Sequence, residues 1–177
     1  GNFPFTTLVD RKIPVKAIAI ESPNLLHALV VANDSPIKSI KDLKGSNPPA
    51  TIGLVTGSSA EFYFQMAAQI NGLEIGKDVI LKNMPPGEQM ALPKGVTGVV
   101  PWDPAPTLMV EERKNGRIID SIFPYNMFEG QFYLRSEIIE NAPDVAQAFS
   151  DAFAEATLWI RRFPEKAAEL KSQDPML

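Results

Sequence analysis

Two serines and a glycine stand where a short apolar run gives way to a helical pattern. The run covers residues 51–55, and Gly57, Ser58 and Ser59 come just after it. This order predicts a strand, a tight turn and a helix. The first backbone N–H groups of such a helix have no partner within the helix, so they can bind an acidic or hydrogen-bond-accepting group of a ligand. We therefore predict ligand contacts at Gly57, Ser58, Ser59 and Ala60.

The same residues allow an internal explanation that needs no ligand. Ser58 is followed three residues later by Glu61, the pattern of a capping box whose side chains satisfy the helix terminus. The charge of Glu61 also opposes a strong anion bound one turn away. The sequence alone is compatible with both a ligand site and a helix capped by its own side chains.

A tryptophan and an aspartate follow a second apolar run, at residues 96–100. Trp102 and Asp103 are enclosed by Pro101 and Pro104, which gives the indole a rigid position for stacking on a ligand. Asp103 can accept a hydrogen bond from that ligand, or it can cap the next helix while Trp102 is only part of the core.

Asn2, Phe3 and His27, all in the N-terminal part of the chain, are further residues that could have a role in ligand binding. Residues 1–5 are typical of a turn that leads into a short helix at residues 6–10, and Asn2 and Phe3 could line a pocket or simply pack. His27 is the only histidine and lies at the start of a predicted strand, where we expect a structural role.

Composition excludes several classes of protein. The 177 residues are 45 % hydrophobic, enough to bury a core, and a net charge of −4 argues against a nucleic-acid partner. The chain has no cysteine, so disulfides and thiolate metal sites are excluded, and we expect no cofactor or metal. No apolar run is long enough for a membrane span. The chain starts at Gly1 without methionine, and we expect a processed, tagged or incomplete form.

Strands and helices alternate along most of the chain, which predicts an α/β fold with a largely parallel sheet. Ligands of such sheets bind beyond the carboxyl ends of the strands, so the turns after the strands should meet at one edge. The expected strands cover residues 13–20, 25–32, 51–55, 78–82, 96–100, 117–120 and 131–134. The expected helices cover residues 6–10, 39–43, 58–70, 87–92, 104–114 and 164–170, with a long helix from Pro143 whose apolar stripe, including Trp159, should be core.

Five segments in this order carry a resemblance to a known family. They are SPIKSIKDLKG, TIGLVTGSSAEF, NMPPGEQ, VVPWDP and YLRSEIIENAPDVAQAFSDAFAEATLWIRRFPEKAAEL. Together they resemble the solute-binding proteins of ABC importers in the nitrate, sulfonate and taurine group, whose NMT1/THI5-like domain is shared with thiamin-pyrimidine binders. The resemblance covers nearly the whole chain.

The resemblance implies a two-lobed fold of the periplasmic-binding-protein type. Residues 35–121 would form one continuous α/β lobe, and residues 1–34 with 122–177 would form the second. The hinge would lie at residues 32–35 and 121–125. Family members have a further strand–helix–strand–helix unit before the GNFP segment at residues 1–4, so the second lobe is expected to lack its N-terminal strands.

The resemblance also implies a function and its residues. Ser58, Ser59 and Trp102 would contact the ligand from one lobe, and Asn2, Phe3 and Pro4 would face them from the other. The protein would be a monomer that captures a small acidic organic molecule, similar to a sulfonate, a carboxylate or a pyrimidine. It would deliver this ligand to the membrane subunits of an ABC importer, outside the cytoplasmic membrane, either unanchored or lipid-anchored through an N-terminus not present in this chain.

Two other functions are compatible with the same two-lobed fold. One is the effector-binding domain of a transcription regulator, which would need a DNA-binding domain upstream. The other is an enzyme similar to the thiamin-pyrimidine synthases, whose chemistry relies on histidine and cysteine. Because the chain has one histidine and no cysteine, we expect a binding protein and not an enzyme.

Overall fold

Seven strands lie in the part of the chain that the computed structural model describes, which comprises residues 1–22, 26–123, 125 and 129–173. Five of them pair into one sheet in the order β4-β3-β5-β2-β6, and the other two pair separately. The five are β2 (Ala28–Ala32), β3 (Ala50–Leu54), β4 (Val79–Asn83), β5 (Gly98–Val99) and β6 (Gly116–Ser121). The separate pair is β1 (Val15–Ser22) and β7 (Gly130–Arg135), which are antiparallel.

The five-stranded sheet is mixed, although a largely parallel sheet was expected. β3 pairs in parallel with β4 and with β5, whereas β2 is antiparallel to both of its neighbours, β5 and β6. The residue before β2, His27, forms a bridge with Trp102, just beyond the carboxyl end of β5. β2 therefore enters the sheet from the carboxyl edge of the parallel strands, and this entry forces it to run against them.

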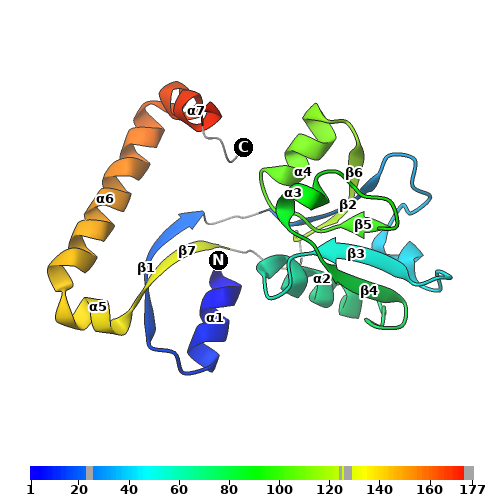
Figure 1. Ribbon diagram of the computed structural model, residues 1–177, viewed down its shortest axis with the longest axis horizontal. Coiled ribbons are helices and arrows are strands. Elements are labelled where there is room, and N and C mark those ends of the chain that lie inside the picture. The colour runs from blue at the N-terminus through cyan, green and yellow to red at the C-terminus, as the bar shows by residue number, and fades with distance from the viewer. Residues whose placement is uncertain (23–25, 124, 126–128, 174–177) are drawn as a thin grey trace.

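Helices cover both faces of the five-stranded sheet (Figure 1). On one face, α2 (Ser59–Ile70) and the short helix η1 (Ile40–Leu43) bury Tyr63, Phe64 and Leu43 against the strands. On the other face, Met109 joins Met84 in a second cluster. Met109 belongs to η2 (Leu108–Glu112), which continues α4 (Ala105–Thr107), and Met84 precedes α3 (Pro86–Gln89). Neighbouring residues of β2 divide between the clusters, as the alternation of a strand requires.

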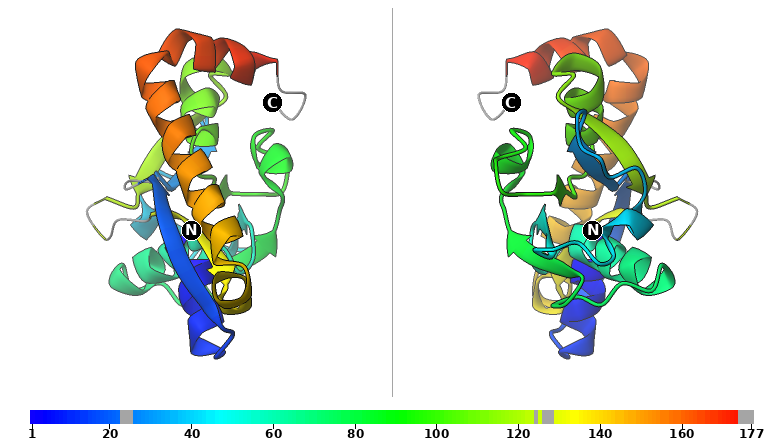
Figure 2. Two further views of the ribbon diagram at one scale, coloured as in Figure 1. Left: turned by 90° about the vertical axis from the view of Figure 1, so that its left-hand side faces the viewer. Right: turned by 90° about the vertical axis from the view of Figure 1, so that its right-hand side faces the viewer.

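The β1–β7 pair also has a helix on each face. α1 (Asn2–Asp10) contacts one face through Phe5, whose ring lies 5.6 Å from that of Tyr133. α6 (Pro143–Arg162) contacts the other through Phe153, whose ring lies 4.9 Å from that of Phe132. α5 (Ser136–Asn141) joins β7 to α6, and α7 (Pro164–Ser172) folds back from the far end of α6 (Figure 2). None of the helices described is long and apolar enough to cross a membrane.

The predicted turn over residues 1–5 is wrong, because α1 begins at Asn2. Pro4 is tolerated in this first turn since a proline there lacks only an N–H that would have no helical partner. The last helix continues past the expected end at residue 170 to Ser172. The short helix expected after Met84 is confirmed, as are the two helices that begin at Pro143 and Pro164.

The chain passes from the β1–β7 pair to the five-stranded sheet between β1 and β2, and it returns to that pair between β6 and β7. The predicted lobe boundary, after residue 34, would separate β2 from the strands with which it pairs on both sides. The division into lobes stays a prediction, and the pairing of β2 favours a first boundary between β1 and β2.

The carboxylate of Asp120 joins α2 to the second crossing. Its Oδ2 accepts a hydrogen bond from the hydroxyl of Tyr63 in α2 at 2.7 Å, and its Oδ1 accepts one from the hydroxyl of Tyr125 at 3.1 Å. Burial raises the pKa of Asp120, while the two hydroxyl bonds act against this rise. Burial of its own hydroxyl, together with the hydrogen bond to Asp120, raises the pKa of Tyr63.

We expect Asp120→Asn to flatten the dependence of stability on pH. Because the pKa of Asp120 is higher in the folded chain than in the unfolded chain, its contribution to stability is fully present at low pH and is lost as the pH rises through the folded-state pKa. Urea unfolding of parent and variant between about pH 4 and pH 7 measures this difference. The exposed Asp34, changed to Asn, is the control and should follow the parent. Parallel profiles for Asp120→Asn and the parent would contradict the prediction.

Phe132→Ala should loosen α6, because Phe132 contacts both Phe149 and Phe153 of that helix at ring distances of 6.0 and 4.9 Å. We expect a loss of about 2 kcal/mol in the free energy of unfolding, measured in urea, with faster amide hydrogen exchange confined to α6. Phe163→Ala, at the end of α6, is the matched control and should cost less than about 1 kcal/mol. Equal losses for the two variants would show that Phe132 does not anchor the helix.

Candidate functional site

Three loops meet at the carboxyl edge of the parallel strands, as the sequence predicted. β3, β4 and β5 run in the same direction, so the segments that follow them leave the sheet on the same side. The backbone N–H of Thr56, after β3, donates to Oδ1 of Asn83 at the end of β4, at 3.0 Å. The edge therefore carries the serine turn and the tryptophan turn together.

The serine turn is partly closed by its own side chains. Ser58 is the N-cap of α2: its hydroxyl accepts from the N–H of Ala60 at 3.1 Å and donates to the carbonyl of Val55 at 2.7 Å. Oε2 of Glu61 accepts from the N–H of Gly57 at 2.6 Å. Each capping bond is displaced by one residue from the standard capping box, but the internal role that the sequence allowed for Ser58 and Glu61 is real.

Three donors at the start of α2 stay without an acceptor in the described part of the chain. They are the hydroxyl of Ser59 and the backbone N–H groups of Ser59 and Glu61. Ser59 is only 6 % exposed, and Ala60, beside it, is fully buried. Self-capping thus satisfies part of the helix terminus and leaves the other part available for an acceptor.

The first turn of α1 lies against this terminus. A Cβ placed on Gly1 would be 3.1 Å from Oγ of Ser59, and the ring of Phe3 stacks on that of Phe62 in α2 with their centroids 4.6 Å apart. Asn2, Phe3 and Pro4 are therefore the opening residues of a helix and not a loop. The structure places Gly1 beside Ser59 and Phe3 beside Phe62, while ligand contact by Asn2, Phe3 and Pro4 stays a prediction.

Trp102 and Asp103 lie on the same edge, but no contact with the serines is found in the described residues. The ring of Trp102 is half-buried against the larger core cluster, 6.3 Å from the ring of His27. The backbone N–H of Asp103 donates to the carbonyl of Leu26 at 3.1 Å. The N-cap of α4 is Pro104, without a side-chain bond, so Asp103 does not cap that helix.

Sequence reasoning missed two polar residues at the start of β7. The carbonyl of Glu129 accepts from the backbone N–H of Asn2 at 3.0 Å, and its carboxylate accepts from Nε2 of Gln131 at 2.9 Å. The side-chain oxygens of Asn2 and Gln131 are buried and have no donor among the described residues. Gln131 opens a strand that the sequence did predict, but only the fold shows that this strand end adjoins α1.

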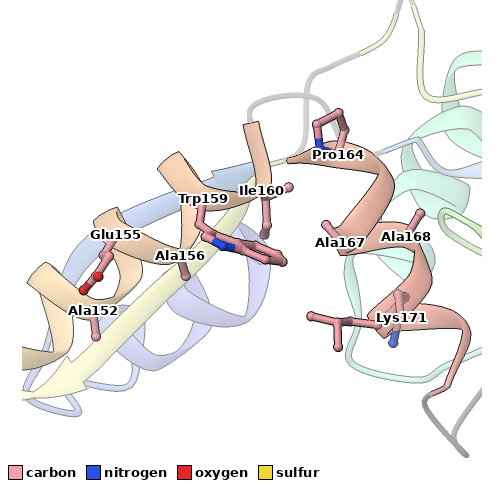
Figure 3. A pocket seen from close by; sticks show the side chains of 10 residues that line it. Ala152, Glu155, Ala156, Trp159, Ile160, Pro164, Ala167, Ala168 and Lys171 are labelled. Carbon is pink, nitrogen blue, oxygen red and sulfur yellow. The ribbon is translucent and has the colours of Figure 1, made fainter. Parts of the chain in front are cut away.

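A hollow of about 990 Å³ lies elsewhere, between α6 and α7 (Figure 3). Its lining is almost entirely apolar, and Trp159, which the sequence placed in the core, faces it with 37 % of its surface exposed. Binding sites for small ligands combine apolar walls with a few convergent polar groups, whereas this hollow is lined by apolar residues apart from Glu155 and Lys171. In the described residues, no group of histidines, aspartates and glutamates could hold a metal ion.

Comparison with known proteins identifies the family. The sequence profile of the NMT1/THI5-like family matches residues 5–167, nearly the whole chain. The chain belongs to the NMT1/THI5-like family. No match is found among curated proteins.

Solved structures show the same fold. The periplasmic aliphatic sulphonate-binding protein SsuA from Escherichia coli matches 96 % of this chain, and 57 % of its own, with a TM-score of 0.76 and 20 % identity. The periplasmic sulfonate-binding protein SsuA from Methylobacillus flagellatus matches 97 % of this chain and 51 % of its own, with a TM-score of 0.68 and 28 % identity. For the alkanesulfonate-binding SsuA from Xanthomonas axonopodis, bound to MOPS, the shares are 96 % and 64 %, at a TM-score of 0.67 and 16 % identity.

The chain therefore has the fold of periplasmic binding proteins of ABC importers and spans between half and two thirds of their length. These matches confirm the predicted fold class, a periplasmic-binding-protein-like fold in which one part is incomplete.

The two serines should respond differently to removal of their hydroxyls. Ser58→Ala should lower the free energy of unfolding by about 1 kcal/mol, because this hydroxyl caps α2. Ser59→Ala should change it by less than about 0.5 kcal/mol, because no partner of this hydroxyl is found. Urea unfolding of both variants without ligand checks the prediction, and a larger loss for Ser59→Ala would refute it.

Proposed function

We propose that this chain is the ligand-binding component of an ABC importer and captures a small acidic organic molecule between its two parts. One observation carries the proposal. The start of α2, with three donors unused, faces the first turn of α1, which belongs to the other part of the fold. A ligand accepting those hydrogen bonds would touch both parts at once and so favour their closed arrangement.

Glu61 bears on the kind of acidic ligand. Its carboxylate is bonded to the N–H of Gly57 and lies within the first turn of α2, so a small, fully charged oxyanion would meet its repulsion. An organic molecule can place an acidic group at Ser59 and extend its body away from that charge. The half-buried indole of Trp102, on the same edge, supplies an apolar face for such a body.

The comparisons support a binding role over catalysis. The three proteins named above are described as sulfonate-binding or alkanesulfonate-binding, and the Methylobacillus protein is 28 % identical to this chain over the part that matches. By analogy, the partners of this chain are the membrane subunits of an importer, and its place is outside the cytoplasmic membrane. Gly57, Ser59, Ala60, Trp102 and Asp103 remain our proposed contacts, with residues 2–4 facing them. Ser58 acts as their structural support.

Thermal unfolding of the native protein against a panel of small molecules tests the proposal. The panel holds alkanesulfonates, aromatic carboxylates, pyrimidines, sulfate and nitrate. An organic acid at about one hundred times its Kd should stabilise the folded state by about 2.7 kcal/mol, and sulfate and nitrate should not. Ser59→Ala and Trp102→Ala should weaken the shift. No shift with any compound, for a folded protein, would overturn the proposed function.

A further inference from the structure

A carboxylate and two tyrosine hydroxyls meet where the chain leaves the five-stranded sheet at the end of β6. The carboxylate of Asp120 accepts the hydroxyl of Tyr63, in α2, at 2.7 Å and the hydroxyl of Tyr125, in the crossing between β6 and β7, at 3.1 Å. Nδ2 of Asn71, the residue that follows α2, donates to the hydroxyl oxygen of Tyr125 at 3.5 Å. We call Tyr63, Asn71, Asp120 and Tyr125 the Asp120 network.

The Asp120 network is complete within itself. A carboxylate only accepts hydrogen bonds, so both tyrosine hydroxyls must donate to it, and each of its two oxygens receives one of them. In the described part of the chain, none of the buried polar atoms without a partner belongs to this network, and Asp120 forms no ion pair. Because hydrogen bonds weaken steeply with angle and distance, a satisfied network holds its members in one arrangement.

The core does not need these polar groups for its packing. Tyr63 is fully buried, and Tyr125 packs against the same core cluster with its ring centroid 6.4 Å from that of Tyr63. Phenylalanine at both positions would keep the ring contacts without a hydroxyl that must find a partner away from water. Removing the carboxylate of Asp120 from water also costs free energy that an apolar residue avoids. The network is therefore better suited to fixing a position than to filling the core.

The place of Tyr125 in the chain shows which position is fixed. Before it, Ile122 is completely buried in the five-stranded part, and its N–H donates to the carbonyl of His27 at 2.9 Å. After it, β7 begins at Gly130 and pairs with β1 in the other part. Among the described residues of this crossing, Tyr125 is the last that bonds to the five-stranded part. The direction in which the chain leaves for β7 thus depends on its hydroxyl.

We propose that the Asp120 network is a latch that holds the β1–β7 pair in one arrangement relative to the five-stranded sheet. While the hydroxyl of Tyr125 is bonded to Asp120, the crossing is fixed to α2. Without this bond, the two parts can change their arrangement although both cores stay intact. The stacking of Phe3 on Phe62 also joins the parts, but an apolar contact tolerates sliding that a hydrogen bond does not. The latch acts without a ligand and goes beyond the proposed function.

The distance between two spin labels, measured by pulsed electron paramagnetic resonance in the ligand-free protein, tests the latch. The chain has no cysteine, so Asp10→Cys in α1 and Lys41→Cys in η1, both exposed, place one label on each part. We expect Tyr125→Phe to broaden the distribution of label distances. Hydrogen exchange of the Ile122 amide should become about tenfold faster, as the loss of a hydrogen bond to a charged group would give.

Two further variants make the test specific. Asp120→Asn should have the same effect as Tyr125→Phe, because one amide oxygen replaces the two carboxylate oxygens that accept the hydroxyls. Tyr133→Phe is the matched control: its ring contacts Phe5, no hydrogen bond of its hydroxyl is found among the described residues, and it should keep the distance distribution of the parent.

The outcomes decide the inference independently of ligand binding. An unchanged distance distribution in a Tyr125→Phe or Asp120→Asn protein shown by circular dichroism to be folded would overturn the latch, even if the Ile122 amide exchanged faster. The network would then hold only the crossing and not the arrangement of the two parts. Equal broadening in Tyr133→Phe would also overturn it, because the effect would not be specific to the hydroxyl of Tyr125. Neither result changes the test of the proposed function.

Discussion

The burial of α2 against the five-stranded sheet sets the position of the candidate site. Tyr63 and Phe64 are completely buried on one side of this helix, and that contact fixes the direction in which its first turn points. The first turn must then satisfy N–H groups that the helix itself leaves unpaired. Ser58 and Glu61 satisfy two N–H groups and hold the turn in shape, while the donors next to them stay unused. Structural and binding roles thus divide between adjacent residues of one turn.

Asp120 connects the helix of the serine turn to the segment that leads from β6 toward β7. It takes hydrogen bonds from Tyr63, which lies in α2, and from Tyr125, which lies in the crossing toward β7. A shift of Tyr125 would therefore act through Asp120 on Tyr63, in the helix that carries the serine turn. Glu129, further along the same crossing, bonds to Asn2 of α1. Beside these hydrogen bonds, Phe3 of α1 stacks on Phe62 of α2, so polar and apolar contacts together join the two parts.

Local pattern was enough to predict the strand, turn and helix at residues 51–70, because apolar spacing and capping residues act within a few positions. It was not enough for β2, whose antiparallel place between β5 and β6 depends on where the chain returns from the other part. The helix at Asn2 was missed because Gly1 and Pro4 are also turn residues. Glu129 and Gln131 were missed because the residue that brings them to the site, Asn2 of α1, is more than one hundred residues away in sequence. The stripe of α6 was recognised, but its partner was assumed, and Trp159 is exposed.

The charges around the site decide between classes of ligand more sharply than the helix terminus does. Unpaired N–H groups favour an acidic group, but the carboxylate of Glu61 lies in the same turn, and no lysine or arginine lies in the serine and tryptophan turns. Coulomb repulsion between the carboxylate of Glu61 and a bound anion is only weakly screened by salt in a partly buried site. A small anion would gain hydrogen bonds from α2 and lose part of that gain to repulsion by Glu61. A ligand with an organic body can place its acidic group at the start of α2 and extend the rest of the molecule away from the carboxylate of Glu61.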